Sequence, residues 1–147
     1  MIKIDVDAEA QARPGLAISP ETAFFILLKA RAFDEKVEAT DPDSGSNPSD
    51  DKEVDVLEDS PDDPTYAELT AAVRRLNDDE QRDLISLIWI GRGDFSIDEL
   101  DQAREGAADI GRARAPRYVA GIPMVSDYLE EALSQFGHTL GDYLDEH

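Results

Sequence analysis

The chain has no cysteine and only two histidines among its 147 residues. Without thiols it has no disulfide, no thiolate nucleophile and no cysteine ligand for zinc. The histidines, His138 and His147, both lie in the last ten residues. Their number and position argue against a catalytic Ser–His pair and against a metal site with histidine ligands. Catalysis by carboxylates stays open, but nothing in the pattern singles out a pair among the 34 acids.

Long apolar runs are also missing. No run reaches the length that crosses a membrane, and the N-terminal MIKIDVDAEA lacks the basic-then-apolar pattern of a secretion signal. We therefore expect a cytoplasmic protein with no membrane partner.

Positive charge is scarce, since 14 bases face 34 acids and the net charge is −20. Residues 34–63 alone carry thirteen acids and two lysines. Such a field repels nucleic acid and favours basic proteins or hard cations as partners. The simpler interpretation is that the acidity keeps the protein soluble.

Apolar residues make up 41% of the chain, which is enough for a real core. Helical spacing of these residues predicts an all-α protein, a compact bundle of about five to six helices around a central helix-turn-helix hairpin. We expect a loosely ordered N-terminal segment over residues 1–18, one helical domain over 19–137, and a short, acidic, frayed tail over 138–147.

The central hairpin is predicted between residues 77 and 110. Asn77 with Glu80, and Ser96 with Glu99, have the spacing of two capping boxes. The first helix is expected to end at Gly91 in the left-handed conformation. Its apolar face includes Trp89, which we expect to anchor the core.

The first strong helix is predicted to begin at Ser19, with Pro20 at its first position. Its sequence AFFILLKARAF is apolar nearly all round. A helix of this kind is expected to be central and covered by others, including the stripe formed by Phe25, Leu28 and Ala32.

Arg92 and Asp94, at the hairpin turn, are the candidate binding residues of the chain. They are polar and lie in a rigid corner, but the interpretation that the sequence favours is that they cap helix ends and brace the turn. A basic run over Arg112, Arg114 and Arg117 either pairs with carboxylates of the chain or binds an anionic ligand.

A second candidate site is the loop over residues 41–51. Asp41, Asp43, Asp50 and Asp51 supply hard oxygen ligands for a weak divalent-cation site. Their order matches no calcium-binding loop.

Four blocks of the sequence resemble a small bacterial family that is catalogued only as a domain of unknown function, number 3775. The most specific are WIGRGD (89–94) and DYLEE (127–131). The resemblance extends over residues 18–137, in the blocks ISPETAFFILLKARAFDEK (18–36), DPDSGSNPSDDKEVDVLED (41–59), LNDDEQRDLISLIWIGRGD (76–94) and APRYVAGIPMVSDYLEEALSQFG (115–137). It implies a helical, intracellular bacterial protein and lends no catalytic residue.

Three functions follow from these patterns. The charge asymmetry favours a non-catalytic protein-interaction module that binds a basic protein surface or a partner helix. A divalent-cation or small-ligand sensor built on the 41–51 loop is the alternative, and a carboxylate-dependent enzyme is a further one. No cofactor is expected, and the sequence leaves the oligomeric state open.

Overall fold

The computed structural model describes residues 15–40 and 63–146, and this part of the chain is all-α, with no strand. Its helices, in chain order, are α2 (Pro20–Thr40), α4 (Pro64–Arg74), α5 (Asp78–Arg92), α6 (Leu100–Ala108), α7 (Ala115–Ala120), α8 (Val125–Gln135) and α9 (Leu140–Glu146). The predicted class is confirmed, and the seven helices described are close to the expected five or six. None of them is both long and apolar enough to cross a lipid bilayer.

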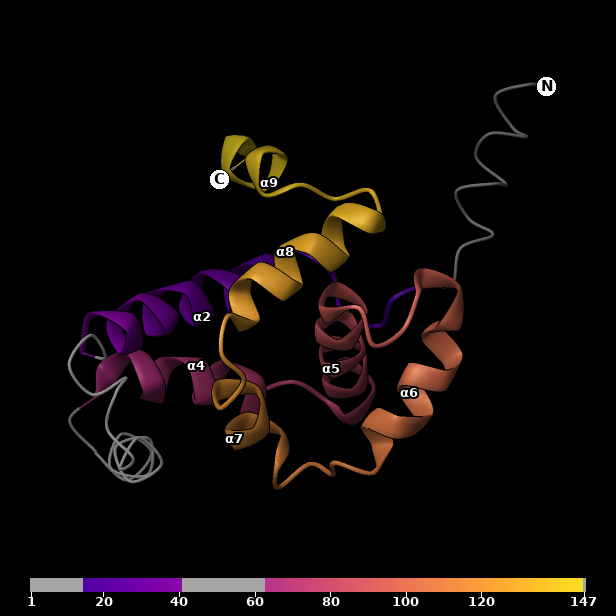
Figure 1. Cartoon of the computed structure of the whole chain (residues 1–147), viewed down its shortest axis with the longest axis horizontal. Helices are drawn as coiled ribbons and strands as arrows, with labels where there is room; N and C mark the ends of the chain where they lie inside the picture. The colour runs from indigo at the N-terminus through magenta and orange to yellow at the C-terminus, as the bar shows by residue number, and fades with distance from the viewer. Residues whose placement is uncertain (1–14, 41–62, 147) are drawn as a thin grey trace.

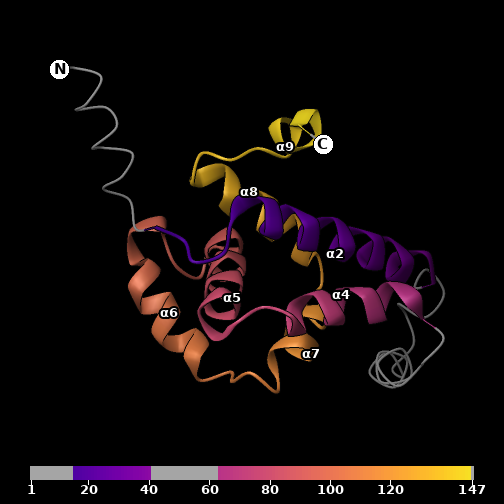
Figure 2. The same cartoon turned by 180° about the vertical axis from the view of Figure 1, so that it is seen from behind.

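Helix α5 occupies the centre of the molecule. In both views α6 lies on one side of it and α2 and α4 lie on the other (Figures 1 and 2). α5 packs against α6 and α8, α8 packs also against α2, and α4 lies between α2 and α7. The largest fully buried side chains come from this arrangement: Ile18, Phe24, Ile26, Leu27, Leu69, Leu84, Ile85, Leu87, Ile88, Leu100, Leu129 and Leu133.

The predicted helix starts are confirmed by their capping hydrogen bonds. The Ser19 hydroxyl accepts the Thr22 N–H at 3.1 Å at the start of α2. Asn77 and Glu80 exchange two hydrogen bonds of 2.8 Å at the start of α5. These bonds satisfy backbone N–H groups that the first turn of a helix leaves without a partner.

The second capping pair begins a different element from the one expected. Glu99 accepts the Ser96 N–H at 2.8 Å, but residues Ile97–Glu99 form a 3-10 turn and α6 begins only at Leu100. The hairpin is therefore present, with a tighter first turn in its second helix.

The predicted role of Gly91 is wrong. Helix α5 continues through Gly91 to Arg92, and Gly93 adopts the left-handed conformation that ends it, with φ at +97°. Gly91 instead lies where α5 meets α8. A Cβ atom at this position would lie 1.8 Å from the carbonyl oxygen of Tyr128. Only glycine therefore allows the two helix backbones to approach so closely.

Helix α8 is capped by a residue from another helix. Met124, the residue before α8, has φ at +62° and its side chain forms no cap. Instead, the Asp34 carboxylate of α2 accepts the Ser126 N–H at 3.2 Å and the Ser126 hydroxyl at 2.9 Å. A negative charge at the N-terminal end of a helix also has a favourable interaction with the helix dipole.

The C-terminal residues differ from the expected frayed tail. Residues Leu140–Glu146 form α9, which rests on α2. The rings of Phe24 and Tyr143 stack there, with centroids 5.1 Å apart. The expectation failed because the tail supplies an aromatic side chain to the core, which its acidic composition does not indicate.

Replacing Gly91 with alanine is expected to destabilise the protein by about 1–3 kcal/mol, because the new methyl group forces α5 and α8 apart. The free energy of unfolding is to be measured from urea denaturation followed by circular dichroism. Gly141→Ala is the matched control, since a Cβ at this helical glycine meets no atom within 4 Å. Equal stability of Gly91→Ala and the wild type would show that α8 does not lie so close to α5.

Candidate functional site

A buried ion pair joins three segments of the chain near α5. The Asp83 side chain of α5 is only 3% exposed and pairs with Arg104 of α6. Arg104 Nε donates to one carboxylate oxygen at 2.7 Å and Nη2 donates to the other at 3.1 Å. The Ala17 N–H also donates to this carboxylate, and Arg104 Nη2 donates to the Gly15 carbonyl at 2.7 Å.

This pair holds the segment before α2 against α5 and α6. Hydrogen bonding to Asp83 raises the pKa of Arg104, although burial lowers it. Asp83 is not among the residues predicted from the sequence, although the sequence carries a signal for it. Asp83 directly precedes the apolar run Leu84–Ile88, so an acid stands beside the buried face of a helix. Such an acid requires a cationic partner.

A surface depression of about 720 Å³ adjoins the pair. It is lined in part by Leu16, Arg82, Asp83 and Arg104. Both carboxylate oxygens of Asp83 accept hydrogen bonds from Arg104. The buried acid of this depression is thus held as an ion-pair partner, which does not suit it to act as a general base.

The two predicted binding residues at the hairpin turn lie together. Arg92 Nη2 is 2.6 Å from Asp94 Oδ2, and Arg92 Nε donates to the same oxygen at 2.8 Å. The hydrogen bond to Asp94 raises the pKa of Arg92. Both residues are exposed, and each is engaged by the other. This geometry fits the bracing role, and a binding role for the pair stays a prediction.

An aromatic cluster lies beside this turn. Trp89 Nε1 donates to the Tyr118 hydroxyl at 2.8 Å, and the Trp89 ring centroid is 5.9 Å from that of Phe95. Trp89 is half-buried, so it lies at the edge of the core and not in its centre. A Cβ at Gly106 would lie 3.1 Å from the Trp89 ring, which shows how closely α6 approaches it.

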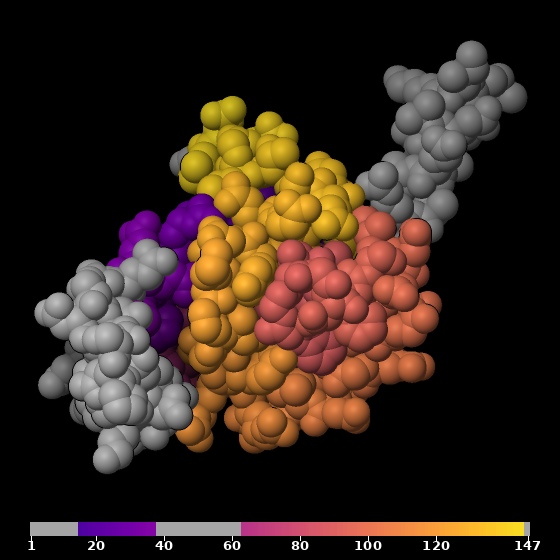
Figure 3. All heavy atoms as spheres, viewed as in Figure 1, coloured from indigo at the N-terminus to yellow at the C-terminus, as the bar shows by residue number. Residues whose placement is uncertain are grey.

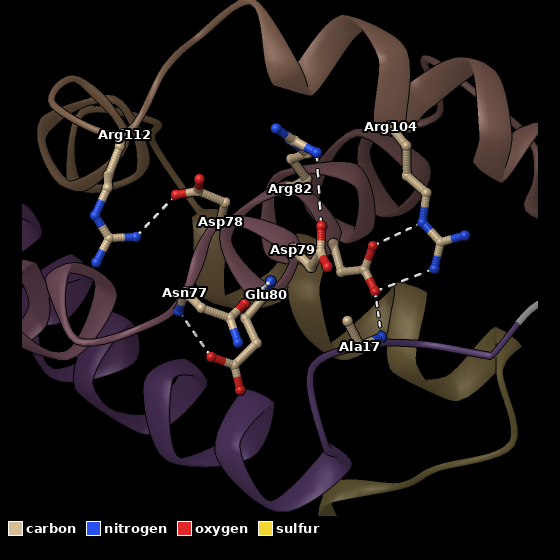
Figure 4. Close-up of polar contacts among 9 residues, drawn as sticks. Ala17, Asn77, Asp78, Asp79, Glu80, Arg82, Arg104 and Arg112 are labelled. Carbon is tan, nitrogen blue, oxygen red and sulfur yellow. Dashed lines mark hydrogen bonds and ion pairs between the residues drawn. The ribbon is translucent and has the colours of Figure 1, made fainter.

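Within the basic run, Arg112 is bound to the chain itself. It pairs with Asp78 at 3.0 Å, at the first turn of α5 (Figure 4). It also donates to the Arg74 carbonyl at 3.4 Å. This arginine therefore connects the chain after α6 to the start of α5. Arg114 is exposed, and Arg117 already has an interaction within the protein.

The predicted cation site falls outside the described residues. Asp41, Asp43, Asp50 and Asp51 all belong to the segment 41–62, so the structure does not test them. Over residues 15–40 and 63–146, no three His, Cys, Asp or Glu side chains gather in a way that could hold a metal ion.

One face of α2 is apolar and faces solvent, contrary to the expectation that other helices cover it. Phe25 is 41% exposed, Leu28 is 36% exposed, and Ala32 is also exposed. We call these three residues the α2 stripe. They lie at i, i+3 and i+7, so they form one line along the helix. The apolar composition of α2 is consistent with complete burial, and only the packing leaves this side open.

Ion pairs flank the α2 stripe on both sides. Lys29 pairs with Glu68 of α4 at 3.1 Å and also lies 5.2 Å from the centre of the Phe25 ring. Arg31 pairs with Glu130 of α8 at 2.9 Å. The stripe is thus an apolar surface bordered by charges that the protein already neutralises.

A third pair, Lys36 with Asp63, joins the end of α2 to the start of α4 at 2.9 Å. Burial raises the pKa of the Asp63 carboxyl, but hydrogen bonds from Thr65 and Lys36 outweigh it, and the pKa lies below its ordinary value. Asp63 also caps α4, accepting the Thr65 and Tyr66 N–H groups. Among the surfaces described, the α2 stripe is the candidate functional site, because it places partly exposed apolar side chains in one line along a helix.

Replacing Asp83 with alanine is expected to destabilise the protein by about 2–4 kcal/mol, because Arg104 loses its partner at a partly buried position. Urea denaturation gives the free energy of unfolding. The double variant Asp83→Ala with Arg104→Met is expected to recover at least half of the loss. If the double variant is as unstable as the sum of both single changes, the two side chains do not act as a pair.

Comparison with known proteins confirms the family resemblance for the blocks 76–94 and 115–137, and it does not extend to the blocks 18–36 and 41–59. The family model described as a protein of unknown function (DUF3775) matches residues 66–138, from α4 to the end of α8. No curated protein and no solved structure shows a significant match. The matched segment contains α5, α6 and both capping pairs, whereas α2 precedes it. Through residues 66–138, the chain belongs to the family of proteins of unknown function DUF3775.

Proposed function

We propose that the protein is a non-catalytic interaction module whose α2 stripe binds an amphipathic helix of a basic partner protein. The observation that carries this proposal is the exposure of Phe25 and Leu28 beside Ala32 on one line of a long helix. Exposed apolar side chains that gather on one face, instead of being scattered, are typical of interaction surfaces.

The spacing of the stripe favours a helical partner. From Phe25 to Ala32 it extends about 10 Å along α2, since each residue adds about 1.5 Å. An amphipathic helix presents apolar side chains at the same repeat and binds by placing them along such a line.

Charge favours a basic partner. Glu21 lies four residues before Phe25 and Glu35 lies three residues after Ala32, so both acids are on the line of the stripe and both are exposed. They are about 21 Å apart along the helix. Basic side chains at both ends of the partner helix would face them, and the net charge of −20 attracts such a partner over a longer range.

The same charges disfavour two other occupants. In an antiparallel pair of α2 helices from two copies, Glu35 of each copy would face Glu21 of the other. Each copy also carries a net charge of −20, which repels a second copy and repels nucleic acid.

The cation sensor and the carboxylate-dependent enzyme remain alternatives. The aspartates of the sensor lie outside the described residues. The buried carboxylates that the structure describes, Asp63 and Asp83, are held in ion pairs. No observation on the described residues favours either alternative over the stripe.

The proposal is tested with two synthetic peptides that share leucines at i, i+3 and i+7 but carry either lysines or glutamates elsewhere. Binding to the full chain is measured by fluorescence anisotropy at low and high salt. We expect the lysine peptide to bind more tightly than the glutamate peptide. High salt is expected to weaken this binding without abolishing it, because salt screens the charges and leaves the apolar contact.

Changing Phe25 and Leu28 together to serine is expected to weaken binding of the lysine peptide about tenfold or more, as two apolar contacts are lost. Met124→Asn is the matched control, because Met124 is 50% exposed, lies outside the stripe, and has a positive φ that asparagine accepts. Unchanged affinity of the serine variant would mean that the peptide responds only to net charge. Self-association that the serine variant abolishes would assign the stripe to a second copy.

A further inference from the structure

The apolar surface of α2 does not end at the α2 stripe. Phe24 lies four residues before Leu28, so the two side chains are neighbours on the helix surface. Phe24 is nevertheless only 2% exposed. The low exposure of Phe24 is due in part to α9. The Tyr143 ring of α9 stacks on the Phe24 ring, with ring centroids 5.1 Å apart and an angle of 25° between the ring planes. α9 therefore covers one end of a larger apolar surface.

Helix α9 lies at the periphery of the bundle, on α2. Figures 1 and 2 show it beyond α8, at the end of an extended connection, and in Figure 3 its atoms form a separate projection above α2 and α8. The connection begins at Gly137, which has φ at +92°, and leads to Leu140. The chain can therefore turn between α8 and α9 without distortion of either helix.

The stability of α9 depends on its contact with α2. It has only seven residues, and isolated helices of fewer than about 12–15 residues are marginal in water. Thr139 caps its N-terminal end, where the Thr139 hydroxyl accepts the Asp142 N–H at 3.1 Å. Leu140 and Tyr143 are partly buried against the core, whereas Leu144 is 52% exposed. One aromatic stack and one leucine thus hold most of its apolar contact.

A depression of about 200 Å³ marks the boundary between α9 and α2. It is lined by Glu21, Phe24, Asp142 and Tyr143 together with residues of the connection. Glu21 of α2 and Asp142 of α9 therefore border the same space. These two acids carry the same charge, so they do not attract each other.

We infer that α9 is a displaceable cover over one end of the α2 stripe, and that its release extends the docking surface for a basic amphipathic helix to include Phe24. This inference rests on the proposed function. A partner that occupies the extended surface must displace Tyr143. Only molecules in which α9 is undocked can bind the partner on the extended surface. The larger the docked fraction, the lower the apparent affinity of the partner for the protein. The protein thus carries its own competitor for the site.

Tyr143→Ala in the full chain tests the inference by two measurements. Hydrogen exchange with mass spectrometry is expected to show faster exchange over residues 140–146, while α5 and α8 keep their protection. The lysine peptide described above is expected to bind this variant about threefold or more tightly than the wild type. The gain is expected to disappear when Phe25 and Leu28 are also changed to serine.

Leu144→Ala is the matched control, because it shortens an exposed apolar side chain on the same helix without touching Phe24. It is expected to leave both the exchange of residues 140–146 and the peptide affinity unchanged. An equal effect of both variants would mean that helix content, and not the ring stack, governs the result.

The outcomes separate the two proposals. If the lysine peptide binds the wild type and Tyr143→Ala equally, α9 is not a competitor, and the proposed function stands. If exchange over α5 and α8 rises together with that over α9, α9 is an integral part of the core and the inference is overturned. If the peptide binds neither protein, the proposed function fails and the role of α9 as a cover for a docking surface fails with it.

Discussion

The close approach of α5 and α8 at Gly91 is the contact on which the rest of the bundle depends. A side chain there would overlap the Tyr128 carbonyl, so the helices meet backbone to backbone. This contact fixes α8 on the central helix α5, and α8 in turn fixes the position of α2. Asp34 caps α8 and Arg31 pairs with Glu130, so one side of α2 faces α8. With about 100° between successive residues, the α2 stripe falls on the other side and faces solvent.

Charge has two separate roles in this protein. Arg31, Arg92, Arg104 and Arg112 all pair with acids of the chain, and three of these pairs connect segments that are distant in sequence. Because the acids outnumber the bases by twenty, the surface stays strongly negative after these pairs are formed. Such a field increases the rate of encounter with any basic protein, but it does not select among them. In the proposed function, selectivity would therefore come from the apolar stripe, whose shape and spacing a partner would have to match.

The packing of α9 on α2 limits the apolar surface that α2 exposes. Phe24 and Phe25 are consecutive, yet α9 covers one and leaves the other accessible. The exposed apolar area is thus smaller than the helix itself would present. The family match begins after α2, at residue 66, so the matched region contains the central hairpin and its supports, and the stripe lies in a part of the chain that precedes it.

The sequence by itself determined the helical class and most helix starts, because a capping residue acts within three or four positions of its own N–H partners. Ser19, Asn77 and Glu80 could be recognised for this reason, and so could the role of Arg92 and Asp94 in bracing a short turn. Only the tertiary structure decided which glycine ends α5, which residue caps α8, and which side of α2 remains open. Each of these depends on a contact across tens of residues: Gly91 with Tyr128, Asp34 with Ser126, and Phe24 with Tyr143. The sequence of a helix that is apolar all round does not indicate which side will be exposed. That side is set by how many helices pack around it.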